Sequence, residues 1–202
     1  EVPGLDWIRL MYFYPMYIDR PLLETIATSE KILPYIDMPL QHADDTMLRR
    51  MSRRVNQQQM NEQIDLMRDI IPDLVLRTTF ITGFPGETDE QFETMVEFVQ
   101  RHRFERMGTF TYSLEPDTPA AKLPNHVDAS TMADRQARLM QVQQDIMFEF
   151  NESLVGRSMN VILDHAVPDQ PGAWVGRGPG DAPDVDGLVF VTQTDHALAP
   201  GQ

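Results

Sequence analysis

Short apolar segments alternate with segments of helical periodicity along the first part of the chain. Four segments rich in β-branched and aromatic residues are typical of strands: residues 7–13, 35–40, 74–82 and 107–112. Four others carry apolar residues at three- and four-residue steps, which predicts helices with one buried face: residues 21–31, 44–53, 56–71 and 88–102. Strands joined by helices of this length predict right-handed crossovers and a parallel sheet.

The pattern changes after the fourth predicted strand. A proline-rich stretch leads to a long predicted helix over residues 131–155, where Thr131 and Asp134 match a helix-start signature and Gly156 is placed to end it. Beyond that helix, residues 159–163 and 188–192 are short and β-branched, and the turns between them are rich in Gly, Pro and Asp. The carboxyl-terminal segment therefore predicts a small antiparallel β-module.

Composition and charge narrow the class of protein. The chain has 202 residues, 42% of them hydrophobic, which is enough to bury a core. No apolar run approaches the roughly 18 residues of a membrane span, so we expect no membrane partner and a cytoplasmic location. The net charge of -14 disfavours a bare phosphate backbone as partner. The absence of Cys excludes a disulfide or a thiolate metal site within these residues.

A glycine turn follows the third predicted strand. Gly83 and Gly86 allow positive φ and a close approach of a ligand to the backbone, and Pro85 stiffens the turn between them. Thr88 and Gln91 match the capping box, so we expect a helix to begin directly after this turn. The spacing fits neither a Walker A loop nor the dinucleotide fingerprint, and an ordinary tight turn between strand and helix remains an alternative.

Polar residues share one face of two neighbouring predicted strands. Arg77 and Thr79 alternate along the third strand, and Asp37 and Gln41 do so along the second. Tyr112 ends the fourth strand. These residues indicate a polar barrel interior, although a buried ion pair of Asp37 and Arg77 with only a structural role explains part of the pattern equally well.

Several long motifs in order resemble the radical SAM methylthiotransferases. They cover nearly the whole chain: WIRLMYFYP, LPYIDMPLQHADDTMLRRMSRR, LRTTFITGFPGETDEQF, FERMGTFTYSLEPDTPAAKLP and VGRGPGDAPDVDG. The resemblance implies an α/β fold in which the later strands of a partial radical SAM (TIM-like) βα barrel are followed by a long helix and a small all-β TRAM module. The implied boundaries are residues 1–125 for the partial barrel, 126–156 for the linker and connecting helix, and 157–202 for a truncated TRAM module. The abrupt ends of the chain suggest a fragment of a longer protein.

The resemblance also implies the cofactors. It places S-adenosyl-L-methionine (SAM) beside the glycine turn, and it implies two 4Fe-4S clusters in the parent enzyme, whose cysteine ligands are absent from this chain. The implied cofactor-binding residues are Gln41, Thr79, Gly83, Gly86 and Tyr112, with Asp37 and Arg77 as supporting polar groups. No residue is assigned a catalytic or metal-binding role, and we expect the chain to be inactive alone.

Charge bears on the substrate that the resemblance leaves open. Residues 156–202 contain two Arg and six Asp, a net charge of -4, which favours a basic ribosomal protein of the small subunit over tRNA. In the implied reaction the β-carbon of an aspartate in that protein is methylthiolated. We expect Asp181, Asp184 and Asp186 to dock this substrate, although turn chemistry also explains aspartates beside Pro and Gly.

Two other functions stay open at this point. One is the tRNA methylthiotransferase activity of sister enzymes, and the other is a non-catalytic acidic module that binds a basic protein. Four arginines in the segment RRMSRR, residues 49–54, oppose the acidic trend, and we expect them to form a solvated helix face paired with carboxylates.

Overall fold

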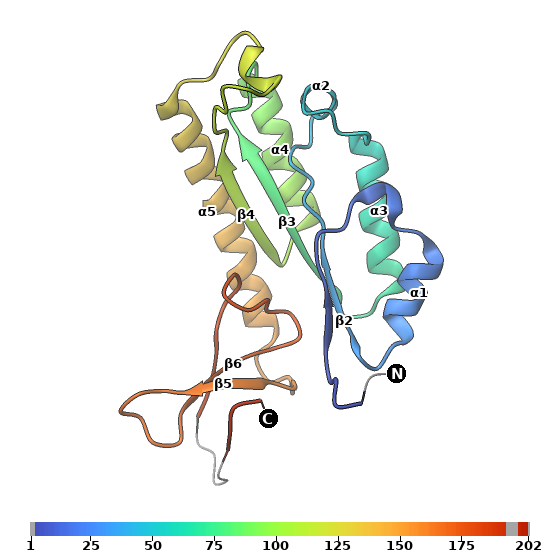
Figure 1. Ribbon diagram of the computed structural model, residues 1–202, viewed down its shortest axis with the longest axis vertical. Coiled ribbons are helices and arrows are strands. Elements are labelled where there is room, and N and C mark those ends of the chain that lie inside the picture. The colour runs from blue at the N-terminus through green and yellow to red at the C-terminus, as the bar shows by residue number, and fades with distance from the viewer. Residues whose placement is uncertain (1–2, 193–197, 202) are drawn as a thin grey trace.

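The computed structural model describes residues 3–192 and 198–201 and contains two separate sheets (Figure 1). The larger sheet has four parallel strands in sequential order: β1 (Ile8–Leu10), β2 (Ile32–Asp37), β3 (Val75–Thr82) and β4 (Arg106–Thr111). The connecting helices are α1 (Arg20–Thr28), α2 (Asp45–Arg50), α3 (Gln57–Ile70) and α4 (Asp89–His102). This arrangement confirms the predicted α/β fold with parallel crossovers.

The remaining elements follow the sheet or lie in its loops. Two short 3-10 segments are η1 (Pro15–Tyr17) and η2 (Ala120–Lys122), and the long helix is α5 (Ala129–Ser153). The smaller sheet is antiparallel and consists of β5 (Ile162–Ala166), β6 (Trp174–Arg177) and β7 (Val189–Val191). It lies beyond the amino-terminal ends of the parallel strands, since the arrowheads of β3 and β4 point away from it (Figure 1).

Local side-chain chemistry sets where the helices begin. Asn56 and Thr88 each form a complete capping box with the Gln three residues later, which confirms the predicted start of α4. The predicted start of α5 at Thr131 is wrong, because the carboxylate of Asp128 accepts the Thr131 N–H at 2.9 Å and the helix begins at Ala129. An aspartate cap three residues earlier satisfies the same free N–H groups.

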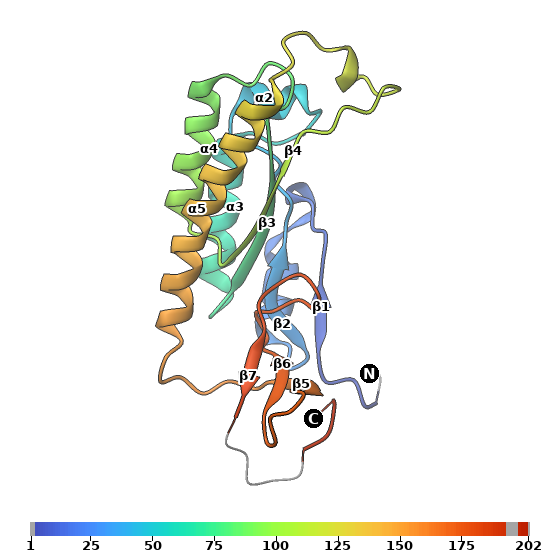
Figure 2. The ribbon, with the colours of Figure 1, turned by 90° about the vertical axis from the view of Figure 1, so that its left-hand side faces the viewer.

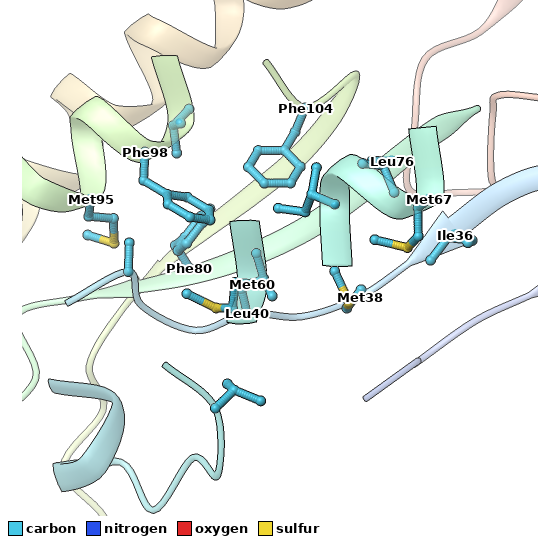
Figure 3. Packing of buried hydrophobic residues seen from close by; sticks show 14 of the residues in the cluster. Ile36, Met38, Leu40, Met60, Met67, Leu76, Phe80, Met95, Phe98 and Phe104 are labelled. Carbon is cyan, nitrogen blue, oxygen red and sulfur yellow. The ribbon is translucent and has the colours of Figure 1, made fainter. Parts of the chain in front are cut away.

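The main core lies between the parallel sheet and helices α3, α4 and α5, which cover one face (Figure 2). Along β3, Thr78, Phe80 and Thr82 are buried toward these helices. Phe80, Phe98 and Phe104 form an aromatic cluster with ring centroids 6.1–6.4 Å apart (Figure 3). Phe80 contacts the other two rings edge-on, which adds to the burial of apolar area and fixes the strand that precedes the glycine turn.

The opposite face of the sheet, which we call the inner face, carries the alternating residues. Arg77, Thr79 and Ile81 of β3 point to it, as do Tyr35 and Asp37 of β2. Its lower part holds a second apolar cluster of Leu33, Tyr35, Val75 and Ala182. Because Ala182 comes from the segment between β6 and β7, the smaller sheet is connected to the barrel through this face.

The carboxyl-terminal module was only partly predicted. Residues 188–192 correspond to β7, and the predicted strand at 159–163 starts too early, because β5 runs from Ile162 to Ala166. Strand β6 was missed, since WVGR is short and interrupted by Gly176, where a Cβ would lie 2.5 Å from the Ile162 carbonyl oxygen. In the part of the chain that the structure describes, no helix has the length and apolarity of a membrane span.

Candidate functional site

A cavity of about 610 Å³ opens at the carboxyl ends of the parallel strands. Three of the predicted site residues line it together: Gln41 after β2, Thr79 on β3 and Tyr112 after β4. Parallel sheets and barrels bind ligands at this end because loops from several strands converge there. The cavity is therefore the candidate functional site.

Gln41 has a strained backbone at the cavity wall. Its φ is +75°, in the left-handed region that non-glycine residues rarely adopt. The conformation is held because the Gln41 N–H donates to the Thr79 carbonyl at 2.9 Å and its carbonyl accepts the Ile81 N–H at 2.9 Å. Strain fixed by neighbouring strands is typical of sites where one side chain must be aimed.

Tyr112 contributes an unsatisfied hydroxyl. Its ring packs edge-on against Phe84 with centroids 5.2 Å apart, and both rings line the cavity. The hydroxyl oxygen is buried and has no hydrogen-bond partner among the described residues. Because buried polar atoms are almost always paired in native proteins, this hydroxyl indicates a missing partner.

Two arginines were not predicted to belong to the site. Arg53 donates to the Pro39 carbonyl at 2.7 Å and stacks on Tyr14, and its buried Nε has no partner in the described structure. Arg50 lines the same cavity. The expected solvated, carboxylate-paired face is wrong for these two, since no described carboxylate lies within ion-pair distance of either guanidinium. The two arginines lie three residues apart at the end of α2, and this spacing is the sequence signal for the role.

The glycine turn has positive φ as predicted, and side chains pack where a Cβ would lie on either glycine. Gly83 and Gly86 have φ of +74° and +81°. A Cβ at Gly83 would lie 2.1 Å from Met132 Cγ, and one at Gly86 would lie 2.3 Å from Arg50 Nη1. In the direction of an added Cβ, the chain's own side chains therefore occupy the space beside both glycines. Their contact with a cofactor through other atoms stays a prediction.

A buried carboxylate holds the glycine turn in place. Glu87, whose side chain is fully buried, accepts the Gly83 N–H at 3.0 Å and binds Arg135 Nη1 at 2.6 Å. It also lies 3.2 Å from His42 Nε2, and His42 Nδ1 accepts the N–H groups of Ala43 and Asp44. These contacts assign the proton to Nε2 and give His42 a structural role. Glu87 was missed because an acidic residue before a helix cap is common.

The lower inner face contains the predicted pair of Asp37 and Arg77. Arg77 Nη1 lies 3.3 Å from Asp37 Oδ1, and Arg77 Nε lies 3.4 Å from Asp186 of the module. Burial opposes the charge of Arg77, but the neighbouring Asp186 and Asp37 raise its pKa above the ordinary value. Burial and the carboxylate of Asp186 also raise the pKa of Tyr35, which donates to Asp186 at 2.9 Å. Asp37 and Arg77 therefore support the inner face below the cavity and do not line it.

The aspartates expected to dock a substrate are placed differently from one another. Asp181 is 7% exposed and binds Arg106 Nη2 at 2.7 Å, while the side chain of Asp186 is 4% exposed. An exposed docking role is wrong for these two, because barrel arginines already neutralise them. Asp184 is exposed, with φ of +61°, and its docking role stays a prediction.

The cavity chemistry suits a nucleoside that carries a carboxylate. Aromatic rings such as Tyr112 and Phe84 offer a wall for a planar heterocycle, and hydroxyl and amide groups of Thr79 and Gln41 can bind a ribose. A guanidinium such as that of Arg53 suits a carboxylate. The chain has no Cys, and no group of metal-ligating side chains is found in residues 3–192 and 198–201, so these residues do not fit an iron–sulfur cluster.

Two family models match separate parts of the chain. Residues 5–99 match the model of the radical SAM superfamily, and residues 155–202 match the TRAM domain. A solved radical SAM enzyme, coproporphyrinogen III oxidase (HemN) from Escherichia coli, aligns with a TM-score of 0.58 over 84% of this chain and 46% of its own. Its identity is 12%, so this likeness shows the fold alone.

Curated relatives are much closer in sequence. A protein from Lachnoclostridium phytofermentans is 44% identical over 98% of this chain and 45% of its own length. One from Synechococcus sp. (strain JA-2-3B'a(2-13)) is 45% identical over 93% of this chain and 39% of its own length. Both are named ribosomal protein uS12 methylthiotransferase RimO. The chain spans about half the length of the curated relatives it matches.

Proposed function

Because the chain belongs to the radical SAM superfamily and carries a TRAM domain, we propose that it forms the carboxyl-terminal part of a radical SAM methylthiotransferase whose substrate is ribosomal protein uS12. The proposed reaction adds a methylthio group to the β-carbon of an aspartate of that protein, in the cytoplasm. The observation that carries the proposal is the cavity at the carboxyl ends of the strands, where Gln41, Thr79 and Tyr112 converge.

The cavity residues would hold the adenosine and amino-acid parts of SAM. Tyr112 brings a buried hydroxyl without a partner, and Arg53 brings a buried Nε without one, so a polar ligand that reaches them supplies the hydrogen bond that each lacks. Gln41, whose backbone has positive φ, lines the same space. When bound, SAM supplies the radical that removes a hydrogen atom and the methyl group that is transferred.

The residues of this chain orient the ligand and keep water away from it. The buried network of Glu87, Arg135 and His42 fixes the glycine turn at the rim, so the wall formed by Phe84 does not have to reorganise on binding. Iron–sulfur ligands would come from outside this chain, because it has no Cys. In this proposal the chain positions the cofactor and does not reduce it.

Binding of S-adenosylhomocysteine, a stable analogue of SAM, tests the cavity directly. We expect calorimetry to show one site, weakened about 5- to 10-fold by Tyr112→Phe, because one hydrogen bond to a buried hydroxyl is lost. Tyr17→Phe is the matched control, since Tyr17 is 77% exposed and lies outside the cavity. Equal affinities of the two variants would remove the cavity as the cofactor site.

Binding of the substrate tests the second half of the proposal. Fluorescence anisotropy with labelled uS12 and with labelled tRNA, each at low and high salt, compares the two macromolecules. We expect the chain to prefer uS12. Tight tRNA binding that weakens steeply with salt would instead assign the chain to the tRNA-modifying enzymes of the same superfamily.

A further inference from the structure

Three of the four parallel strands each direct one guanidinium group onto the lower inner face. Arg9 of β1 stacks over the Tyr35 ring at 4.2 Å, and Arg77 of β3 pairs in register with Arg106 of β4, so all three share this face. Among the inner-face residues of the described strands, only Asp37 offers a carboxylate to one of these arginines, Arg77. Taken alone, this part of the barrel carries an excess of two positive charges in a largely buried setting, which is unfavourable.

The segment between β6 and β7 supplies the missing negative charge. This acidic loop, residues 178–187, places Asp181 against Arg106 and Asp186 against Arg77, so three cations face three carboxylates. Arg9 donates to the backbone carbonyls of Pro179 and Asp181, each at 2.8 Å. Residues from all four strands, Tyr35 among them, therefore contact the same loop.

The acidic loop also fits the inner face by shape. Ala182 is 4% exposed and packs in the apolar cluster with Leu33, Tyr35 and Val75. A Cβ at Gly180 would lie only 2.9 Å from Val75 Cγ2, so the loop backbone rests directly on β3. Internal hydrogen bonds shape the loop further, since Asp181 accepts the Gly178 N–H and Asp186 accepts the Ala182 N–H.

From this combination of charge, shape and backbone contact, we propose that the acidic loop is a fixed floor that closes the amino-terminal end of the barrel. The functional consequence of this floor rests on the proposed function. The uS12 side chain reaches the cavity from the rim at the carboxyl ends of the strands, and the floor keeps water from entering at the opposite end. The TRAM module then contributes to the reaction chamber itself. A docking arm would instead leave the inner face when a substrate binds.

An engineered disulfide distinguishes a fixed floor from a movable arm. The ideal Cβ at Gly180 lies 3.7 Å from the Val75 Cβ, a distance suited to a disulfide, and the chain has no Cys of its own. We expect V75C/G180C to cross-link in about nine-tenths of the molecules under mild oxidation. The control V75C/D184C places the second Cys at an exposed loop position and should cross-link at a much lower yield.

Ligand binding by the locked protein gives the decisive result. If the acidic loop is a floor, oxidised V75C/G180C binds uS12 and S-adenosylhomocysteine within about twofold of its reduced form. A loss of uS12 affinity of about tenfold or more on locking, or a failure to cross-link, would overturn the proposal.

A second measurement covers the case in which the cysteine variant does not fold. Trp7 packs on the lower apolar cluster, so acrylamide quenching of Trp7 in a Trp174→Phe background reports water access to the floor. We expect the quenching constant to rise about twofold or more in D181N/D186N and to stay unchanged in D184N. Equal quenching in both would count against a floor.

The two measurements also separate this proposal from the proposed function. If the unmodified chain binds neither S-adenosylhomocysteine nor uS12, the proposed function fails. Cross-linking and quenching need no ligand, so they still decide whether the acidic loop closes the barrel.

Discussion

Replacing Gly83 by Ala tests what the glycine turn is for. If the turn leaves room for a cofactor, Gly83→Ala should fold normally and lose cofactor affinity. In the structure, the new methyl group would instead meet Met132 of α5, with Cγ at 2.1 Å and Cβ at 3.1 Å. The main collision is with Cγ and Sδ, and the contact with Cβ at 3.1 Å requires α5 to give by a few tenths of an ångström more.

Two costs add up at this position. An Ala at φ of +74° costs about 1 to 2 kcal/mol because its Cβ crowds the following carbonyl. Overpacking against Met132 costs about 1 to 3 kcal/mol more. We therefore expect Gly83→Ala to lose about 3 kcal/mol of unfolding free energy, a large share of the ~5 to 15 kcal/mol typical of a domain. Gly172→Ala, at φ of +80° with nothing within 4 Å, should pay only the backbone cost.

Urea denaturation followed by circular dichroism at 222 nm measures both variants, and a double variant isolates the clash. Met132→Ala removes the colliding Cγ and Sδ atoms. We expect the double variant Gly83→Ala with Met132→Ala to be no less stable than Gly83→Ala alone. The loss in the double variant would then be about 2 kcal/mol smaller than the sum of the two single losses, and this difference is the coupling energy of the two positions. If Gly83→Ala and Gly172→Ala lose the same stability, or if the two substitutions at Gly83 and Met132 simply add, the self-packing explanation is refuted.

Three further predictions concern buried charges. In the same urea titration, Asp181→Asn should lower the unfolding free energy by about 3 kcal/mol, because Arg106 loses its carboxylate partner. Asp186→Asn should lower it by about 2 kcal/mol, because Arg77 keeps Asp37 as a partner. Asp184→Asn should change it by no more than about 0.5 kcal/mol. Burial lowers the pKa of His102 to about 4, so the folded state binds this proton more weakly than the unfolded chain does. The unfolding free energy should therefore be highest above about pH 6.5 and fall by at most about 3 kcal/mol as the pH is lowered toward 4. Thermal melts of His102→Gln should not show this loss. Glu87→Gln should lower the melting temperature by leaving Arg135 with only the exposed Asp89 as counter-charge, whereas an unchanged melting temperature would contradict a structural role for that network.

The parallel sheet could be predicted from the sequence because each element carries its own periodicity. Phe92, Met95, Val96 and Val99 mark one helix face, and the capping box at Thr88 marks its start, so both levels agree with the structure. Short elements gave weaker signals. Strand β6 has four residues, and the start of α5 depended on which of two polar residues formed the cap.

The site was harder to predict because its residues come from separate segments. Gln41 and Thr79 line the same cavity, but Gln41 lies beyond the end of β2 and pairs in register with Phe80, so alternation along the strand does not explain its position. Arg50 ends α2 and Arg53 follows it, and only the folded backbone shows that both line the cavity. Side-chain partners that lie far apart in sequence, such as Met132 for Gly83, leave no local signal.

The same limit applies to the charge argument for the substrate. A net count treats all aspartates of the module as surface groups, but Asp164, Asp181 and Asp186 are paired with arginines inside the protein. Exposed carboxylates such as Asp169 and Asp184 remain for a partner, which is a weak basis for preferring a basic protein over RNA. The preference for uS12 therefore rests on the curated relatives, and the acidity of the loop is explained by the cations of the barrel. A charged motif is evidence about a partner only after its intramolecular partners have been identified.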